Sequence, residues 1–216
     1  MSINNYTELQ TAIGNWLNRS NLTDRIPEFI SLAEGELNVK LRLREMNKIA
    51  TGPYSNGSRY VALPSGHLEL LNLQIKVATA DDSTYENPVF VAPEKLARRY
   101  VSSTGTPKFY TLRDQIEFNQ EVSALHTLKM NYIKGWDIST DTTNWLLSNF
   151  EGIYLWGSLL QAEAFVKNDK RVALWRSNFE LVMSRLNILD ERSKDDAVLS
   201  TGDVVQLHSR NSGFNI

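Results

Sequence analysis

Few residues of this chain have the types and spacing that metal binding requires. Four polar residues alternate as the first ligands of a calcium loop do: Asp137, Ser139, Asp141 and Thr143. The later positions of that pattern are missing, because the sixth is Thr142 where the turn needs glycine and the twelfth is Ser148 where a glutamate should bind. We therefore interpret residues 141–143 as caps for the helix that follows.

The histidines and the absent motifs also argue against an enzyme. His67, His126 and His208 lie in a predicted turn, strand and tail, and none has a second ligand at metal-site spacing, so we expect surface or packing roles. The chain has no cysteine, which removes disulfides, thiolate nucleophiles and cysteine metal sites. It also has no Gly-rich phosphate loop, His-Glu-x-x-His or Gly-x-Ser-x-Gly motif. We expect no catalytic residues, no cofactor and no metal.

Two groups of basic residues have the chemistry to contact nucleic acid. Lys40, Arg42 and Arg44 lie near the end of a predicted helix, where they also suit the negative end of the helix dipole. Arg98 and Arg99 precede Tyr100, whose ring could stack on a base. A solvated helix end and a solvated turn explain the same residues. The net charge of -2 and the pI of about 6.0 lack the basic excess of an autonomous nucleic-acid binder. A nucleic-acid-binding module that uses these five cations remains the alternative function.

The stretch from Thr143 to Lys194 predicts two long helices that fold back as a hairpin. On the first helix, apolar residues recur at helical spacing on two adjacent faces: Leu146, Phe150, Ile153, Gly157, Leu160 and Ala164, beside Leu155, Leu159, Ala162 and Val166. Such a wide apolar surface predicts a helix that is central in its domain or packed on another chain. The second helix follows a polar break at 167–170 and has one apolar face: Val172, Trp175, Phe179, Val182, Leu186 and Leu189. The tryptophans at 16, 145, 156 and 175 also fall at apolar helical spacing, as in a core or a subunit interface.

The remaining segments complete a predicted α+β fold. Residues 1–48 predict two helices, the first capped by Asn5 or Thr7 and the second with Pro27 in its first turn. From about Ile49 the period becomes strand-like, with strands expected at 59–63, 70–77, 89–91, 108–112, 115–119 and 125–133 and a short helix at 94–100. We expect the helices of 1–48 and 143–194 to form an antiparallel bundle, with a small antiparallel β domain at 49–142 inserted between them. Residues 195–216 are rich in glycine, serine and asparagine and predict an extended C-terminal tail.

The overall composition is that of an ordinary globular protein, with 42% hydrophobic and 22% charged residues. The first five residues carry no basic region and no apolar run, so we expect no signal peptide. No apolar run approaches the ~20 residues needed to cross a bilayer, and we expect no membrane partner.

Four stretches of the chain resemble the head-to-tail adaptor proteins of tailed bacteriophages. These are residues 26–34 (IPEFISLAE), 60–64 (YVALP), 103–110 (STGTPKFY), and 144–147 (NWLL) leading to 154–160 (YLWGSLL). Such adaptors are also called connector or head-completion proteins, and the chain is most similar to those of short-tailed phages. The resemblance covers about Tyr6 to Lys194.

The resemblance implies a non-enzymatic structural protein of the virion, located at the head–tail interface and assembled in the cytoplasm of the host bacterium. It implies that copies of the chain form a ring, a dodecamer, beneath the portal protein. The ring would extend the DNA channel and dock tail or nozzle proteins, while genomic DNA passes without sequence-specific binding. Of the basic residues, Lys40, Arg42 and Arg44 are possible DNA-facing positions.

In that family the helices form a bundle, neighbouring bundles pack around the ring, and a terminal arm can insert into the portal. The resemblance therefore suggests which apolar residues form subunit or portal interfaces. On the first C-terminal helix these are Leu155, Trp156 and Leu159. In the C-terminal tail they are Leu199, Val204, Val205, Leu207 and Phe214.

Overall fold

The chain forms two compact units. The computed structural model describes residues 3–54, 57–166 and 170–210, with the side chains of 164 and 192–210 outside that description. Unit 1 comprises Met1–Arg44 and Asp137–Ile216, and unit 2 comprises Glu45–Trp136. Helices dominate unit 1 and strands dominate unit 2, which confirms the predicted α+β class. The inserted unit begins and ends a few residues earlier than the predicted 49–142.

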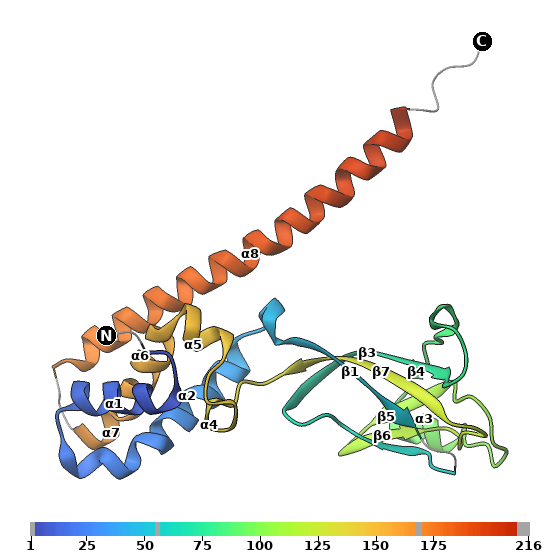
Figure 1. Ribbon diagram of the computed structural model, residues 1–216, viewed down its shortest axis with the longest axis horizontal. Coiled ribbons are helices and arrows are strands. Elements are labelled where there is room, and N and C mark those ends of the chain that lie inside the picture. Colours follow the sequence, from blue (N-terminus) through green and yellow to red (C-terminus); the bar gives the residue numbers. More distant parts are fainter. Residues whose placement is uncertain (1–2, 55–56, 167–169, 211–216) are drawn as a thin grey trace. The chain divides into compact units, whose positions relative to one another are not determined.

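Unit 1 is a helical bundle arranged around α6 (Figure 1). Its elements are α1 (Tyr6–Leu17), η1 (Ser20–Arg25), α2 (Ile26–Lys40), α4 (Ile138–Asp141), α5 (Trp145–Asn149), α6 (Glu151–Gln161), α7 (Glu163–Val166) and α8 (Val172–Arg210). The predicted cap and proline positions are confirmed. The Asn5 side chain accepts a hydrogen bond from the Glu8 N–H at 2.9 Å, and Pro27 lies in the first turn of α2. Helix α6 packs against α1, α2, α5 and α8, so it is the central element.

The single long helix predicted from Thr143 to about Val166 is wrong, because the structure divides it into α5, α6 and α7. Phe150 leaves the helical region between α5 and α6, with φ -140° and ψ 52°. This bend lets both short segments bury their apolar residues, since Leu146 and Leu147 on α5 and Ile153 on α6 are all buried. The helical period continues across the bend, so periodicity alone did not indicate it.

The caps of these short helices also differ from the prediction. Asn144 caps α5 by accepting a hydrogen bond from the Leu147 N–H at 2.8 Å, in place of the predicted residues 141–143. Asp137 caps α4, and that turn ends at Thr142, whose φ is +60°. Because this positive φ turns the chain away from the helical direction, the following helix starts only at Trp145.

Helix α8 is longer than the sequence indicated. The extended tail predicted from residue 195 is helical as far as Arg210, so that part of the prediction is wrong. Once a helix has formed, each added residue contributes one backbone hydrogen bond, and no proline interrupts residues 172–210. The polar composition of residues 195–210 therefore did not end helix α8. Residues 211–216 lie outside the described part of the chain.

Unit 2 contains two small sheets. The strands are β1 (Asn47–Tyr54), β2 (Tyr60–Ala62), β3 (His67–Val77), β4 (Val89–Phe90), β5 (Phe109–Leu112), β6 (Gln115–Phe118) and β7 (His126–Lys134). Short helices η3 (Asp82–Thr84) and α3 (Pro93–Ala97) connect strands, and η2 (Arg44–Met46) leads into β1. One sheet has the antiparallel order β1-β7-β3 and the other the order β2-β6-β5-β4, in which the β4–β5 pair is parallel.

All six strands predicted from the alternating pattern are present, with bounds shifted by up to three residues. Strand β1 is not among the predicted strands, because it contains Pro53 and proline is normally a sign of a turn. A proline is tolerated there since β1 is an edge strand of its sheet. The core of unit 2 lies between residues of both sheets: Tyr54, Leu73, Ile75, Tyr110, Ile116, Phe118, Val122, Leu128 and Met130. The Tyr54 and Phe118 rings stack with centroids 5.1 Å apart.

Candidate functional site

Helices α2, α6 and α8 pack closely because α6 presents a glycine where they meet. A Cβ atom added to Gly157 would lie 3.4 Å from the Ala33 Cβ on α2 and 3.2 Å from a ring carbon of Phe179 on α8. Both distances are at or below ordinary van der Waals contact. Glycine at this position therefore allows α2 and α8 to approach α6 from two sides.

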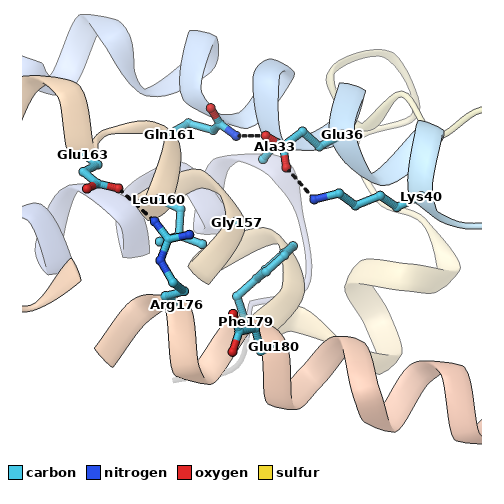
Figure 2. Close-up of a pocket in the computed structure, with 10 residues that line it drawn as sticks. All are labelled: Ala33, Glu36, Lys40, Gly157, Leu160, Gln161, Glu163, Arg176, Phe179 and Glu180. Carbon is cyan, nitrogen blue, oxygen red and sulfur yellow. Dashed lines mark hydrogen bonds and ion pairs between the residues drawn. The ribbon is translucent and has the colours of Figure 1, made fainter. Parts of the chain in front are cut away.

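A hollow of about 330 Å³ opens where these three helices meet (Figure 2). Its lining residues are Ala33, Glu36, Lys40, Gly157, Leu160, Gln161, Glu163, Arg176, Phe179 and Glu180. The apolar lining comes from Ala33, Gly157, Leu160 and Phe179, and the other six side chains are polar. An apolar floor with a charged rim is typical of a surface that receives a side chain of another protein.

The charged residues around the hollow are largely paired with each other. The two carboxylate oxygens of Glu36 accept separate hydrogen bonds from the Lys40 ammonium at 3.0 Å and the Gln161 amide at 2.8 Å. The Arg176 guanidinium lies 3.3 Å from the Glu163 carboxylate. Hydrogen bonds from Lys40 and Gln161 lower the pKa of Glu36 below its usual range. These acids and bases are occupied as ion pairs, which favours recognition over catalysis.

A buried carboxyl group, Glu34, lies one residue beyond Ala33 on α2. One of its oxygens accepts a hydrogen bond from the Tyr154 hydroxyl at 2.7 Å and one from the Ile138 N–H at 3.0 Å. The Tyr154 oxygen in turn accepts a hydrogen bond from the Asn144 amide at 2.8 Å. Burial raises the pKa of Glu34, against the opposing effect of these hydrogen bonds. The cluster joins α2 and α6 to the segment where the chain re-enters unit 1.

The sequence analysis did not identify Glu34 as a buried hydrogen-bonding residue. It is only 7% exposed, and it lies among the buried residues of α2, one turn after Ile30 and one turn before Leu37. An acidic residue at core spacing on a helix was the available signal, because buried carboxyl groups are normally hydrogen-bonded. Its partners Ile138 and Tyr154 are more than 100 residues away in the sequence.

The predicted interface residues on α6 contact their own chain. Leu155 and Leu159 are buried, and Trp156 is half-buried with its ring 4.9 Å from that of Trp16 in an edge-on contact. Their role at a subunit interface stays a prediction. The predicted interface residues of the C-terminal segment, namely Leu199, Val204, Val205, Leu207 and Phe214, have side chains outside the described part of the structure.

The possible DNA-facing residues of unit 1 lie at the C-terminal end of α2. Lys40 pairs with Glu36, and the Arg42 guanidinium donates hydrogen bonds to the Asn38 and Leu41 carbonyls, both at 2.7 Å. Arg42 therefore caps the end of α2, which agrees with the helix-end interpretation of these cations. Arg44 is exposed.

The other basic pair, Arg98 and Arg99, belongs to unit 2. The Arg99 guanidinium lies 4.2 Å from the centre of the Phe109 ring, and both arginines are exposed. Arg59 lies 4.8 Å from the centre of the Tyr100 ring. Tyr100 thus already has a cationic neighbour on one face.

The histidines and the aspartate cluster have structural roles where they are described. The buried His126 ring lies 2.7 Å from the Ala124 carbonyl oxygen through one nitrogen and 3.3 Å from the Thr106 hydroxyl through the other. His67 packs on the Tyr132 ring, and the side chain of His208 lies outside the described residues. Asp137 accepts hydrogen bonds from the Ser139 and Thr140 hydroxyls, which lower its pKa.

Within the part of the chain that the structure describes, no group of three or more His, Asp or Glu side chains is arranged to hold a metal ion. None of the helices in the described ranges combines the length and apolarity needed to span a membrane.

The close approach at Gly157 carries a stability prediction. We expect Gly157→Leu to lower the free energy of unfolding of unit 1 by about 1–3 kcal/mol, because the added atoms would overlap Ala33 and Phe179. Gly35→Leu is the matched control on α2, since a Cβ there meets no other described heavy atom within 4 Å. We expect the control to be neutral or slightly stabilising, because leucine favours helix more than glycine does. Urea unfolding followed by circular dichroism measures both, and equal losses would contradict the packing described.

A family model described as SU10 adaptor protein matches residues 4–204, which is most of the chain. No curated protein matches the sequence.

Proposed function

The chain belongs to the SU10 adaptor protein family, and from that premise we propose that it is a head-to-tail adaptor that forms a ring beneath the portal of a phage capsid. Members of such a family are structural components of the virion and interact with other head or tail proteins. The ring would extend the DNA channel and provide the platform on which tail or nozzle proteins dock. The family match over residues 4–204 is the observation that carries this proposal.

The charge of the chain is compatible with a channel that DNA passes through. The net charge is -2, and Lys40 of the possible DNA-facing residues is paired with Glu36. A strongly basic channel would hold the phosphate backbone and slow the passage of the genome. We propose that twelve copies form the ring and that DNA moves through it without sequence-specific binding.

We further propose that residues 195–216 bind the portal and that unit 2 faces the tail proteins. Helix α8 has 39 residues, or about 58 Å of helix, whereas α6, against which it packs, has 11 residues, or about 17 Å. The greater part of α8 therefore extends beyond α6. A long helical end is suited to reach a second ring, as a docking segment must.

Truncation tests the role of this segment. We expect a chain that ends at Lys194 to fold with an unchanged melting temperature, because the residues of α8 that pack on the bundle, such as Trp175 and Leu186, precede the cut. We also expect it to lose binding to the portal ring of the same phage, measured by co-sedimentation. The full chain is the positive control. A truncated chain that binds portal as well as the full chain would show that the segment is not the portal-binding arm.

The mass of the complex with portal rings tests whether the protein assembles as a ring. Light scattering or native mass spectrometry of the protein alone, and mixed with portal rings, measures how many copies join each ring. We expect a stoichiometric ring of copies on the portal. A protein that stays free in the presence of portal would contradict the adaptor role.

Nucleic-acid binding through Arg98 and Arg99 remains a second candidate, favoured by the half-exposed ring of Tyr100 beside them. It predicts DNA affinity that falls steeply as salt rises, because phosphate contacts release counterions. Absence of DNA binding at low salt would remove this candidate.

A further inference from the structure

A second hollow adjoins the one between α2, α6 and α8 and continues it along α8. Its volume is about 530 Å³, and it shares Lys40, Phe179 and Glu180 with the first hollow. Its other lining residues are Met183, Ser184, Asn187, Ile188 and Glu191. All of these residues belong to unit 1. We call the two hollows together the α8 groove.

The α8 groove has an apolar lining on which an aliphatic chain can lie. Phe179 and Met183 are half-buried, and Ile188 is 46% exposed. The Phe179 ring is fixed by its packing on α6, where a Cβ added to Gly157 would lie 3.2 Å from a ring carbon. The Lys40 ammonium lies 6.0 Å from the centre of the same ring. Covering Met183 and Ile188 removes apolar surface from water, which favours binding in proportion to the area covered.

The charged groups of the groove do not balance. Its lining has a net charge of -2, because it contains the two bases Lys40 and Arg176 and the four acids Glu36, Glu163, Glu180 and Glu191. Both bases are already paired with acids of the groove. Lys40 lies 3.0 Å from Glu36, and Arg176 lies 3.3 Å from Glu163 (Figure 2). Glu180 and Glu191 have no hydrogen-bond or ion-pair partner among the described residues, so the unpaired charge of the groove is negative.

The two unpaired acids lie on the same side of α8. Glu180 and Glu191 are both exposed, and they differ by about 20° around the helix axis and about 16 Å along it. Ser184 and Asn187 lie between them in the lining of the groove. Arg185 lies about 140° around the helix from Glu180 and lines neither hollow. Its charge therefore does not neutralise the groove.

We propose that the α8 groove binds a segment of another protein in which two lysine or arginine residues flank apolar side chains. The two cations pair with Glu180 and Glu191, and the apolar side chains cover Met183 and Ile188. An extended chain advances about 3.3 Å per residue, so basic residues five positions apart match the span of about 16 Å. Exposed ion pairs each add little affinity, but they select the partner and its register. This inference goes beyond the adaptor role and does not rest on it.

The unpaired acids also narrow the choice of partner. Nucleic acid is disfavoured, because its phosphates would face the carboxylates of Glu180 and Glu191. The exposed basic pair of unit 2, Arg98 and Arg99, has no residue between its members and therefore lacks the flanking pattern. We accordingly assign the segment to a different protein and not to a second copy of this chain.

Two synthetic hexapeptides test this assignment. The first has lysine at both ends with two leucines and two serines between, and the second has glutamine in place of both lysines. Backbone amide shifts of the full-length protein, measured by NMR as each peptide is added at low salt, give the place of binding and the Kd. We expect the lysine peptide to shift amides of residues 179–191 and to bind about fivefold more tightly than the glutamine peptide, the equivalent of about 1 kcal/mol. A lysine peptide that shifts no amide of the groove would overturn the proposal.

Removing the two unpaired charges tests their role. A chain with both Glu180→Gln and Glu191→Gln keeps the size of these side chains, and we expect it to bind the lysine peptide about fivefold more weakly and the glutamine peptide unchanged. The control has Asp24→Asn and Glu28→Gln, two exposed positions of unit 1 outside the groove, and changes the net charge by the same amount. We expect it to bind both peptides as the natural chain does. Equal losses in the two double variants would mean that the peptide responds to overall charge, and the proposal would be wrong.

The apolar part of the groove is tested at Ile188. Ile188→Ser removes apolar surface at an exposed position, so we expect it to weaken the binding of both peptides about threefold. Leu181→Ser is the matched control, because Leu181 is 49% exposed on the same helix and lines neither hollow. Equal effects of the two substitutions would contradict the proposed contact between the leucines and the groove.

Native mass spectrometry distinguishes another protein from a second copy. Without peptide, we expect the same masses for the natural chain and for the chain with Glu180→Gln and Glu191→Gln. Dimers or larger species that only the natural chain forms would show that a second copy occupies the groove, which would overturn the assignment to another protein. Melting temperatures measured by circular dichroism should be unchanged in every variant, since all the substituted side chains are exposed.

Discussion

Trp175→Ala is expected to lower the free energy of unfolding of unit 1 by about 3–5 kcal/mol, the range for removing a buried aromatic side chain. Trp175 is fully buried on the inner side of α8, and Leu186 is the other buried residue among the described side chains of this helix. These two side chains hold α8 on the bundle, so the cavity left by alanine should loosen the whole helix. Urea unfolding followed by circular dichroism at the helix band measures the loss, because unit 1 contains most of the helix.

Two control variants sharpen this prediction. The indole nitrogen of Trp175 has no hydrogen-bond partner among the described residues, so Trp175→Phe keeps much of the apolar volume and removes an unsatisfied donor. We expect it to cost clearly less than Trp175→Ala. Leu174→Ala changes the exposed neighbour on the same helix and should stay within about 0.5 kcal/mol. If Leu174→Ala cost as much as Trp175→Ala, α8 would pack through its other side.

Glu34→Ala is expected to lower the free energy of unfolding of unit 1 by about 2–4 kcal/mol. The substitution leaves the Tyr154 hydroxyl and the Ile138 N–H without the acceptor they use now, and each buried unsatisfied donor costs about 1–3 kcal/mol. The same urea experiment measures it. Glu36→Ala is the matched control two residues along α2, because Glu36 is exposed and its ion pair with Lys40 contributes little. Equal effects of the two substitutions would contradict the burial of the Glu34 cluster.

Glu34 also predicts a pH dependence whose sign is opposite to that of ordinary surface acids. Because burial raises the folded-state pKa of Glu34 above its unfolded value of about 4.3, the folded state holds this proton more tightly. Its contribution to stability is therefore greatest below the unfolded pKa and declines as the pH rises through the raised folded pKa. Glu36 acts in the other direction, since its lowered pKa stabilises the fold above the unfolded pKa and is lost as the pH falls.

Glu34→Gln isolates the first of these contributions. Glutamine keeps an oxygen that can accept the hydrogen bond from Tyr154 but has no titrating proton. We expect the difference in unfolding free energy between the natural chain and this variant to shift in favour of the variant as the pH rises above about 4.3. Urea unfolding at a series of pH values measures that difference. A difference that is constant with pH would show that Glu34 has the same pKa in the folded and unfolded states.

Local patterns in the sequence were sufficient to predict most elements and the family. The strands of unit 2 follow from alternating residues between turn signals, and the start of α2 follows from Pro27. The resemblance to phage adaptors rests on short stretches of sequence, and the family match over residues 4–204 confirms it. These features depend on residues that are close together in the chain. They can therefore be predicted from the sequence without knowing which distant segments contact each other.

The tertiary structure decided the features that depend on distant partners. The bend at Phe150 divides a continuous apolar period, so that α5 packs against α6 instead of continuing it. The polar composition of the C-terminal residues did not indicate the full length of α8. Glu34 became a buried hydrogen-bonding centre only because Ile138, 104 residues away, comes to lie beside it. The apolar residues Leu155 and Leu159, which the sequence suggested for an interface, are buried within their own chain, whereas Leu181 and Val39 are exposed. Periodicity shows which residues share a face of a helix, but only the packing of the other helices determines whether that face is covered.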